Sequence, residues 1–177
     1  MNDSPSQSKS KTSPDTDMDL CVVGGAGHVG LPLALSFVNK GLKVLIYDID
    51  EKALGVIASG TMPFAEEGGE EYLTEALASG RLFFSSDPNE IPLNGTIVIT
   101  IGTPIDEFLN PVHKVVKDCF DVLMPHLTDG RLGILRSTIY PGPLEWLDDY
   151  FKEPGRSPPI PFWPERVVTG KAIQDLA

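Results

Sequence analysis

The chain has 177 residues, of which 41% are hydrophobic, and its formal net charge is −11 at pH 7. This length and composition are typical of one globular domain with an apolar core. The acidic balance argues against nucleic acid or an anionic membrane as the main partner, and no stretch reaches the roughly 20 apolar residues that span a bilayer.

The N-terminal segment, residues 1–17, is rich in Ser, Lys, Asp and Pro and has no apolar core. We therefore expect a disordered leader rather than a secretory signal, a folded domain over residues 18–177 and a cytoplasmic location. The two cysteines, Cys21 and Cys119, have no neighbouring His in a metal-ligand pattern. This favours two buried thiols over a disulfide framework or a metal site.

The first element after the leader is a continuous apolar run, Leu20 to Val23, which is typical of a strand buried on both faces. Gly25, Gly27 and Gly30 follow it at the spacing G-x-G-x-x-G. In a strand-to-helix turn of this kind, the first glycine permits the tight turn and the second lets the backbone approach a pyrophosphate. The third lets the helix pack closely against the strand.

A helix is expected from about Val29 to Lys40, with Pro32 in its first turn and Gly41 as its stop. Its amino end would direct free N–H groups and a partial positive charge at phosphates. His28, in the turn before it, is expected to be solvated, with a backbone N–H that faces phosphate.

The second strand, residues 43–47, ends at Asp48, about 20 residues after the glycines, where a ribose-binding acid belongs. A carboxylate there accepts hydrogen bonds from ribose hydroxyls and repels a 2′-phosphate, which favours NAD over NADP. The alternative is that the glycines serve only a tight turn and that Asp48 is a solvated strand end. The strand–helix–strand context favours the dinucleotide site.

The remaining elements alternate between helix and strand. Helices are expected from a cap at Asp50 to about 59, and over 70–79, 111–127 and about 143–151. Strands are expected over 82–85, 96–101, 131–136 and 160–163. We expect a solvated loop at Glu66 and Glu67. The alternation predicts an α/β fold, a Rossmann-type doubly wound parallel sheet of order 3-2-1-4-5-6 with helices on both faces.

This strand order brings several loops to one crevice, because the carboxyl ends of parallel strands meet at the same edge of the sheet. The segments that it gathers are 25–30, 102–104, 137–138 and 164–165. We therefore expect the functional site at this edge.

Five segments together resemble the UDP-glucose/GDP-mannose dehydrogenase family. They read G-A-G-H-V-G-L-P-L-A, Y-D-I-D, I-G-T-P, R-S-T-I-Y-P-G and P-E-R-V-V-T-G-K-A. The resemblance runs from about Leu20 to the end and is greatest to the UDP-N-acetyl-D-mannosamine dehydrogenase branch. UDP-glucose 6-dehydrogenases tend to have Asn where this chain has Trp163, and Trp163 matches neither branch. The resemblance implies oxidation of the C6 alcohol of a UDP-sugar to a carboxylate with NAD, with UDP-N-acetylmannosamine favoured and UDP-glucose next.

The resemblance also implies roles for individual residues, and none of them binds a metal. Those implied to bind the cofactor are Gly25, Ala26, Gly27, His28, Val29, Gly30, Asp48, Thr103, Pro104 and Ser137. Thr138 would hold a water near the reacting carbon, and Glu165 would assist hydrolysis of a thioester. Arg166 and Val167 would line the sugar-nucleotide site. On the residues alone, Thr138 could instead cap the following helix and Glu165 could be a surface acid paired with Arg166.

The chemistry of such enzymes requires a cysteine nucleophile, which the resemblance places in a domain after residue 177. We therefore expect an NAD-binding domain without the family's central helix and catalytic domain, which binds NAD without turnover. The family's oligomer contacts would lie in the same absent part, so no oligomeric state is predicted. The alternatives are a stand-alone NAD-binding module without catalysis and a β-hydroxyacid dehydrogenase, and the R-S-T-I-Y-P-G and P-E-R-V segments argue against the latter.

Overall fold

The computed structural model describes residues 17–102, 107, 112–127, 131–137, 150–151, 161 and 170–176. The predicted leader lies outside these ranges, except for Asp17. So do most of the helix predicted over 143–151 and of the strand predicted over 160–163.

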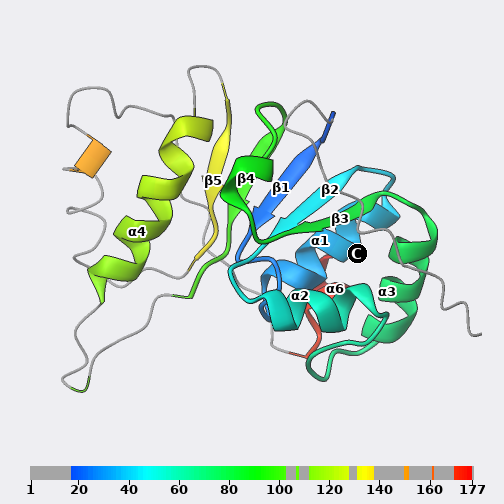
Figure 1. Cartoon of the computed structure of the whole chain (residues 1–177). Coiled ribbons are helices and arrows are strands. Elements are labelled where there is room, and N and C mark those ends of the chain that lie inside the picture. The colour runs from blue at the N-terminus through cyan, green and yellow to red at the C-terminus, as the bar shows by residue number, and fades with distance from the viewer. Residues whose placement is uncertain are drawn as a thin grey trace, which may run out of the picture.

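Within the described residues, five parallel strands form one sheet of order β3-β2-β1-β4-β5 (Figure 1). They are β1 Leu20–Val23, β2 Val44–Tyr47, β3 Leu82–Ser85, β4 Thr96–Ile99 and β5 Gly133–Leu135. This confirms the doubly wound fold and the first five positions of the predicted order. Next to β5, the Leu135 N–H donates to the Pro161 carbonyl at 3.1 Å, where a sixth strand was expected.

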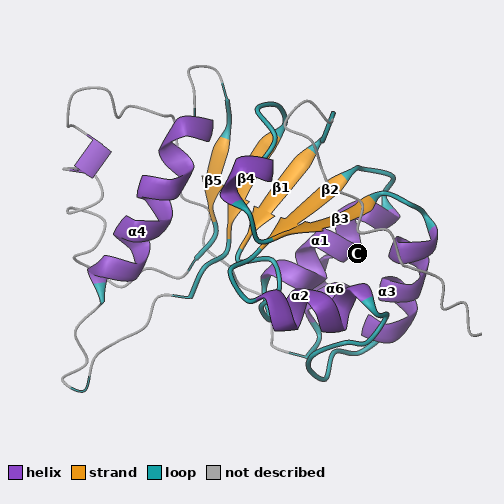
Figure 2. Ribbon diagram, in the orientation of Figure 1, coloured by secondary structure: helices purple, strands orange, loops and turns teal. Residues whose placement is uncertain are grey.

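Helices cover both faces of the sheet, as predicted (Figure 2). They are α1 Gly30–Asn39, α2 Glu51–Ala58, α3 Gly69–Ala78, α4 His113–Leu123 and α6 Ala172–Leu176, with 3-10 turns η1 Pro88–Glu90 and η2 Met124–His126. Residues of α1, α2, α3 and α6 share one apolar cluster with Leu20 and Val22. Residues of α4 share the other cluster with Cys21 and Val23, because successive strand residues point to opposite faces.

The ends of the elements follow local hydrogen bonding. Asp50 caps α2 as predicted, since its side chain accepts from the N–H groups of Lys52 and Ala53, both at 3.0 Å. β4 is shorter than predicted and stops at Ile99, although the Thr100 N–H and hydroxyl still donate to the Val23 carbonyl of β1, at 2.8 and 2.9 Å. In the part of the chain that the structure describes, no helix is long and apolar enough to cross a bilayer.

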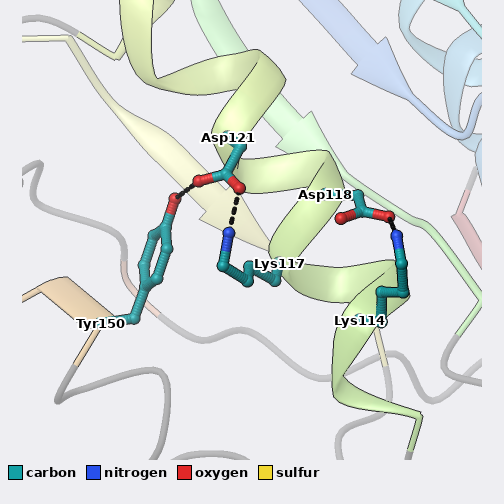
Figure 3. A network of polar contacts seen from close by, with 5 residues as sticks. All are labelled: Lys114, Lys117, Asp118, Asp121 and Tyr150. Carbon is teal, nitrogen blue, oxygen red and sulfur yellow. Dashed lines mark hydrogen bonds and ion pairs between the residues drawn. The ribbon is translucent and has the colours of Figure 1, made fainter.

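A polar contact connects α4 to Tyr150 (Figure 3), and ring contacts connect α4 to both Tyr150 and Phe151, which are helical residues. The Tyr150 hydroxyl donates to Asp121 at 2.6 Å, and Asp121 also forms an ion pair with Lys117. Both aromatic rings pack against Phe120 of α4. The helical residues at the end of the predicted 143–151 helix are thereby anchored on the α4 face of the sheet.

Arg131 lies at the amino end of the strands and is only 6% exposed. Its guanidinium donates to four backbone carbonyls, those of Pro92, Asn94, Gly95 and His126, at 2.7 to 2.8 Å. Burial lowers the pKa of Arg131 from its ordinary value. The side chain therefore joins the segment before β4 to the end of η2, at the edge of the sheet opposite to the glycine turn.

Candidate functional site

The turn after β1 brings backbone atoms into close contact at Gly24 and Gly25. Gly24 has φ +74°, so the left-handed residue of the turn is Gly24. The spacing had assigned the tight turn to Gly25, one position later. Gly25 is required for a different reason, because a Cβ there would lie 2.8 Å from the Val22 carbonyl oxygen and from an Ile46 methyl. Gly24 was missed because it stands outside the G-x-G-x-x-G spacing.

The other two glycines have the geometry that was predicted for them. A Cβ at Gly30 would lie 2.5 Å from the Gly24 oxygen and 2.7 Å from the Thr100 hydroxyl, so α1 packs directly against the ends of β1 and β4. A Cβ at Gly27 would meet only the Gly24 oxygen, at 3.5 Å. The backbone at Gly27 is therefore open to close approach by a ligand.

The start of α1 leaves several backbone donors free. Within the described part of the chain, the N–H groups of His28, Val29 and Gly30 have no protein acceptor. Val29 provides no side-chain cap, and the first turn of α1 contains no acidic residue. Consecutive free N–H groups at the positive end of a ten-residue helix suit an anion such as a pyrophosphate.

Asp48 lies at the carboxyl end of β2 and contacts the glycine turn. One carboxylate oxygen accepts from the Ala26 N–H at 3.0 Å, and the other accepts from the Asp50 N–H at 3.0 Å. Each oxygen keeps a further acceptor site, so the carboxylate is fixed in place and still available to a diol. The next residue, Ile49, is 85% exposed, and it offers an apolar surface beside this carboxylate.

The predicted site residues that the structure describes gather at the carboxyl edge of the sheet. Residues 25–30 follow β1, Asp48 follows β2, and Ser137 follows β5, with its hydroxyl 3.5 Å from the Ile99 carbonyl. Thr100, which the sequence analysis did not single out, joins the ends of β1 and β4 at this edge. The other predicted residues lie outside the described residues: Thr103, Pro104, Thr138, Glu165, Arg166 and Val167.

The loop before α3 contributes contacts that the sequence analysis did not predict. The His28 side chain is exposed, but its ring stacks on Phe64 with centroids 4.0 Å apart and 17° between the planes. Glu66 is not simply solvated, because its carboxylate accepts from the Ile173 N–H of α6 at 2.9 Å. These contacts join segments far apart in the sequence, so local patterns do not reveal them.

Neither cysteine is placed for chemistry. Burial raises the pKa of the Cys21 and Cys119 thiols to about 12, and both lie in the apolar cluster on the α4 face. No group of three or more His, Cys, Asp or Glu side chains within the described ranges is arranged to hold a metal ion.

We predict that both thiols resist an aromatic disulfide reagent at pH 8 in the folded chain, since only about one part in ten thousand is ionised at a pKa of about 12. Two equivalents should react after unfolding in guanidinium. Stability should also fall as the pH rises from about 9 toward about 12, because the unfolded thiols ionise first. Rapid labelling of the native chain would contradict this prediction.

Comparisons with known proteins agree with this geometry. The profile of the UDP-glucose/GDP-mannose dehydrogenase family, NAD binding domain, matches residues 18–177. The UDP-N-acetyl-D-mannosamine dehydrogenase of Methanococcus aeolicus is 34% identical over 161 residues, which are 89% of this chain and 36% of that protein. The UDP-glucose 6-dehydrogenase of Rickettsia conorii is 32% identical over 153 residues, 86% of this chain and 35% of that protein.

Among solved structures, the UDP-D-ManNAc dehydrogenase of Pyrococcus horikoshii superposes with a TM-score of 0.78 at 25% identity. The match covers 88% of this chain and 38% of that one. The chain thus spans little more than a third of the length of these relatives.

Proposed function

Because the chain belongs to the UDP-glucose/GDP-mannose dehydrogenase family as its NAD-binding domain, we propose that NAD lies across the glycine turn. The pyrophosphate would accept from the free N–H groups of His28, Val29 and Gly30, and the adenosine ribose would donate to Asp48. NAD is the cofactor of this domain family. The observation that supports the assignment most directly is the 3.0 Å hydrogen bond from the Ala26 N–H to Asp48, because the carboxylate proposed to bind the ribose then lies beside the turn proposed to bind the pyrophosphate.

The same proposal extends to the protein of which such a domain is part. We expect NAD-dependent oxidation of the C6 alcohol of a UDP-sugar to a carboxylate, with Thr138 holding a water and Glu165 assisting thioester hydrolysis. Arg166 and Val167 would contact the sugar nucleotide. UDP-N-acetylmannosamine is the favoured substrate, supported by the P-E-R-V and G-K-A segments and by the 34% identity to a UDP-N-acetyl-D-mannosamine dehydrogenase. UDP-glucose is the next candidate.

For the 177 residues themselves, we propose cofactor binding without turnover, in the cytoplasm. Cys21 is buried and Cys119 is half-buried, and burial raises the pKa of both thiols to about 12, which disfavours either as the nucleophile that the oxidation to a carboxylate requires. A stand-alone NAD-binding module is the second candidate, and the same two thiols favour it. Absorbance at 340 nm with NAD and either UDP-sugar tests both candidates, since turnover by these residues would contradict both.

Asp48→Asn provides the test of the cofactor site. The amide keeps an acceptor oxygen for the Ala26 N–H but loses the charge, and hydrogen bonds to charged groups contribute about 1.5–3 kcal/mol. NAD should therefore bind roughly 10- to 100-fold more weakly, and the preference over NADP should fall because the repulsion of the 2′-phosphate is lost. Calorimetric titrations with both dinucleotides measure this.

Glu71→Gln is the matched control for that substitution, because it removes one negative charge from an exposed residue of α3. Its affinity for NAD should equal that of the unchanged chain. No saturation of the unchanged chain at millimolar NAD would contradict the proposed function, and an unchanged dissociation constant in Asp48→Asn would remove Asp48 from the site.

A further inference from the structure

Residues 61–68, which we call the clamp loop, contact two other segments that are far away in the sequence. On one side, the Phe64 ring stacks on His28 of the glycine turn at 4.0 Å between centroids. On the other side, Glu66 accepts from the Ile173 N–H and the Glu67 N–H donates to the Gly170 carbonyl, both at 2.9 Å. The clamp loop therefore joins the turn before α1 to the start of α6.

The two segments that the clamp loop joins also share a packing interface. Ala172 and Ile173 of α6 are 0% and 2% exposed, and Ile173 belongs to the same apolar cluster as Leu31 and Leu35 of α1. Figure 1 shows α6, drawn in red, next to α1. Residues 170–176 therefore contact α1 directly, and they are connected to His28 through the clamp loop.

We propose that the clamp loop couples NAD binding to the docking of residues 170–176, with Phe64 and Glu66 as positioning residues. The inference rests on the proposed function, which assigns the free N–H groups of the glycine turn to the pyrophosphate. The peptide group of His28 provides one of those donors, and the stacked ring restricts how that peptide can turn. If docking of residues 170–176 favours the arrangement of the turn that binds NAD, then NAD binding favours the docked α6. The coupling free energy is the same in both directions, because linkage is reciprocal.

The first test is the dissociation constant for NAD, measured by calorimetry on the full chain. Phe64→Leu keeps an apolar side chain but loses the ring stack, so NAD should bind about three- to tenfold more weakly, the range expected for an aromatic pair. Phe64→Tyr keeps the ring and should restore the affinity. If Phe64 served only the stability of the fold, Phe64→Leu would lower the melting temperature, but the affinity for NAD would not fall in Phe64→Leu and return in Phe64→Tyr.

Glu66 and its neighbour provide a matched pair of variants. Glu66→Ala removes the acceptor of the Ile173 N–H and should weaken NAD binding by about two- to fivefold, the lower part of the range for a net hydrogen bond. Glu67→Ala removes the same charge one residue later. Its backbone N–H, which makes the contact with Gly170, remains, so its affinity should not change.

Hydrogen exchange at α6 measures the same coupling as an effect of NAD on the docking of residues 170–176. Saturating NAD should slow exchange of the Ile173 amide severalfold in the unchanged chain, and this protection should be lost in Phe64→Leu. Equal NAD affinity in the unchanged chain, Phe64→Leu and Glu66→Ala would overturn the inference, and so would exchange at Ile173 that NAD does not alter. Failure of the unchanged chain to bind NAD would overturn the proposed function together with the inference, so the two failures are distinguishable.

Discussion

Gly30→Ala should abolish measurable NAD binding and lower the free energy of unfolding by about 3 kcal/mol or more, toward the upper end of the cost of overpacking. The added Cβ would lie 2.5 Å from the Gly24 oxygen and 2.6 Å from the Gly25 Cα. Both are backbone atoms in a turn held by β1 and β4, so they cannot move aside as a flexible side chain would. Chemical denaturation and calorimetric titration with NAD measure the two effects.

The same substitution at Gly55 is the control. Gly55 lies inside α2, and a Cβ there would meet nothing within 4 Å. Alanine is favoured over glycine within a helix by about 0.5–1 kcal/mol, so Gly55→Ala should stabilise the chain and leave NAD binding unchanged. If Gly30→Ala and Gly55→Ala had similar free energies of unfolding and similar affinities for NAD, Gly30 would not be needed for the close approach of α1 to the sheet.

Arg131→Met should destabilise the chain by about 4 kcal/mol, a large share of the roughly 5–15 kcal/mol of a typical domain. Methionine fills a similar volume but leaves four carbonyl oxygens without their donors, and each buried unsatisfied group costs about 1–3 kcal/mol. Water that reaches some of these carbonyls reduces the sum. Thermal and urea unfolding measure the loss.

Arg81→Met is the matched control for Arg131, since Arg81 is exposed, and its effect should lie within about 0.5 kcal/mol of zero. Arg131→Lys keeps the charge but offers three donors from one atom, so it should recover only part of the stability. A loss below about 1 kcal/mol in Arg131→Met would show that the four hydrogen bonds contribute little net stability.

The strands near the glycine turn could be predicted from the sequence because their signals are local. Leu82–Ser85 and Leu20–Val23 are strands over the predicted residues, and Asp50 caps α2. A short apolar run beside a glycine turn, like a capping side chain at a helix start, leaves few alternative local structures. The carboxyl-edge location of residues 25–30, Asp48 and Ser137 then followed from the strand order.

Contacts that depend on tertiary structure could not be predicted in this way. α6 has only five residues, too few for a clear helical period, and it is held by packing on α1 and by Glu66. In the sequence, Arg131 is only the first residue of a predicted strand, whereas its four acceptors come from segments up to 39 positions away. A Cβ at Gly24 would also lie 3.0 Å from the backbone nitrogen of Ile101, just after β4, and the spacing of the glycines does not encode this close approach.

The central position of β1 has a consequence for synthesis on the ribosome. Leu20 pairs with Val44 on one edge and with Thr96 on the other. The emerging chain can therefore complete one edge early, but the second remains bare until a much later part has left the exit tunnel. A bare, apolar strand edge invites pairing with other chains, so nascent chains stalled between these two stages are the ones most exposed to aggregation and most dependent on chaperones.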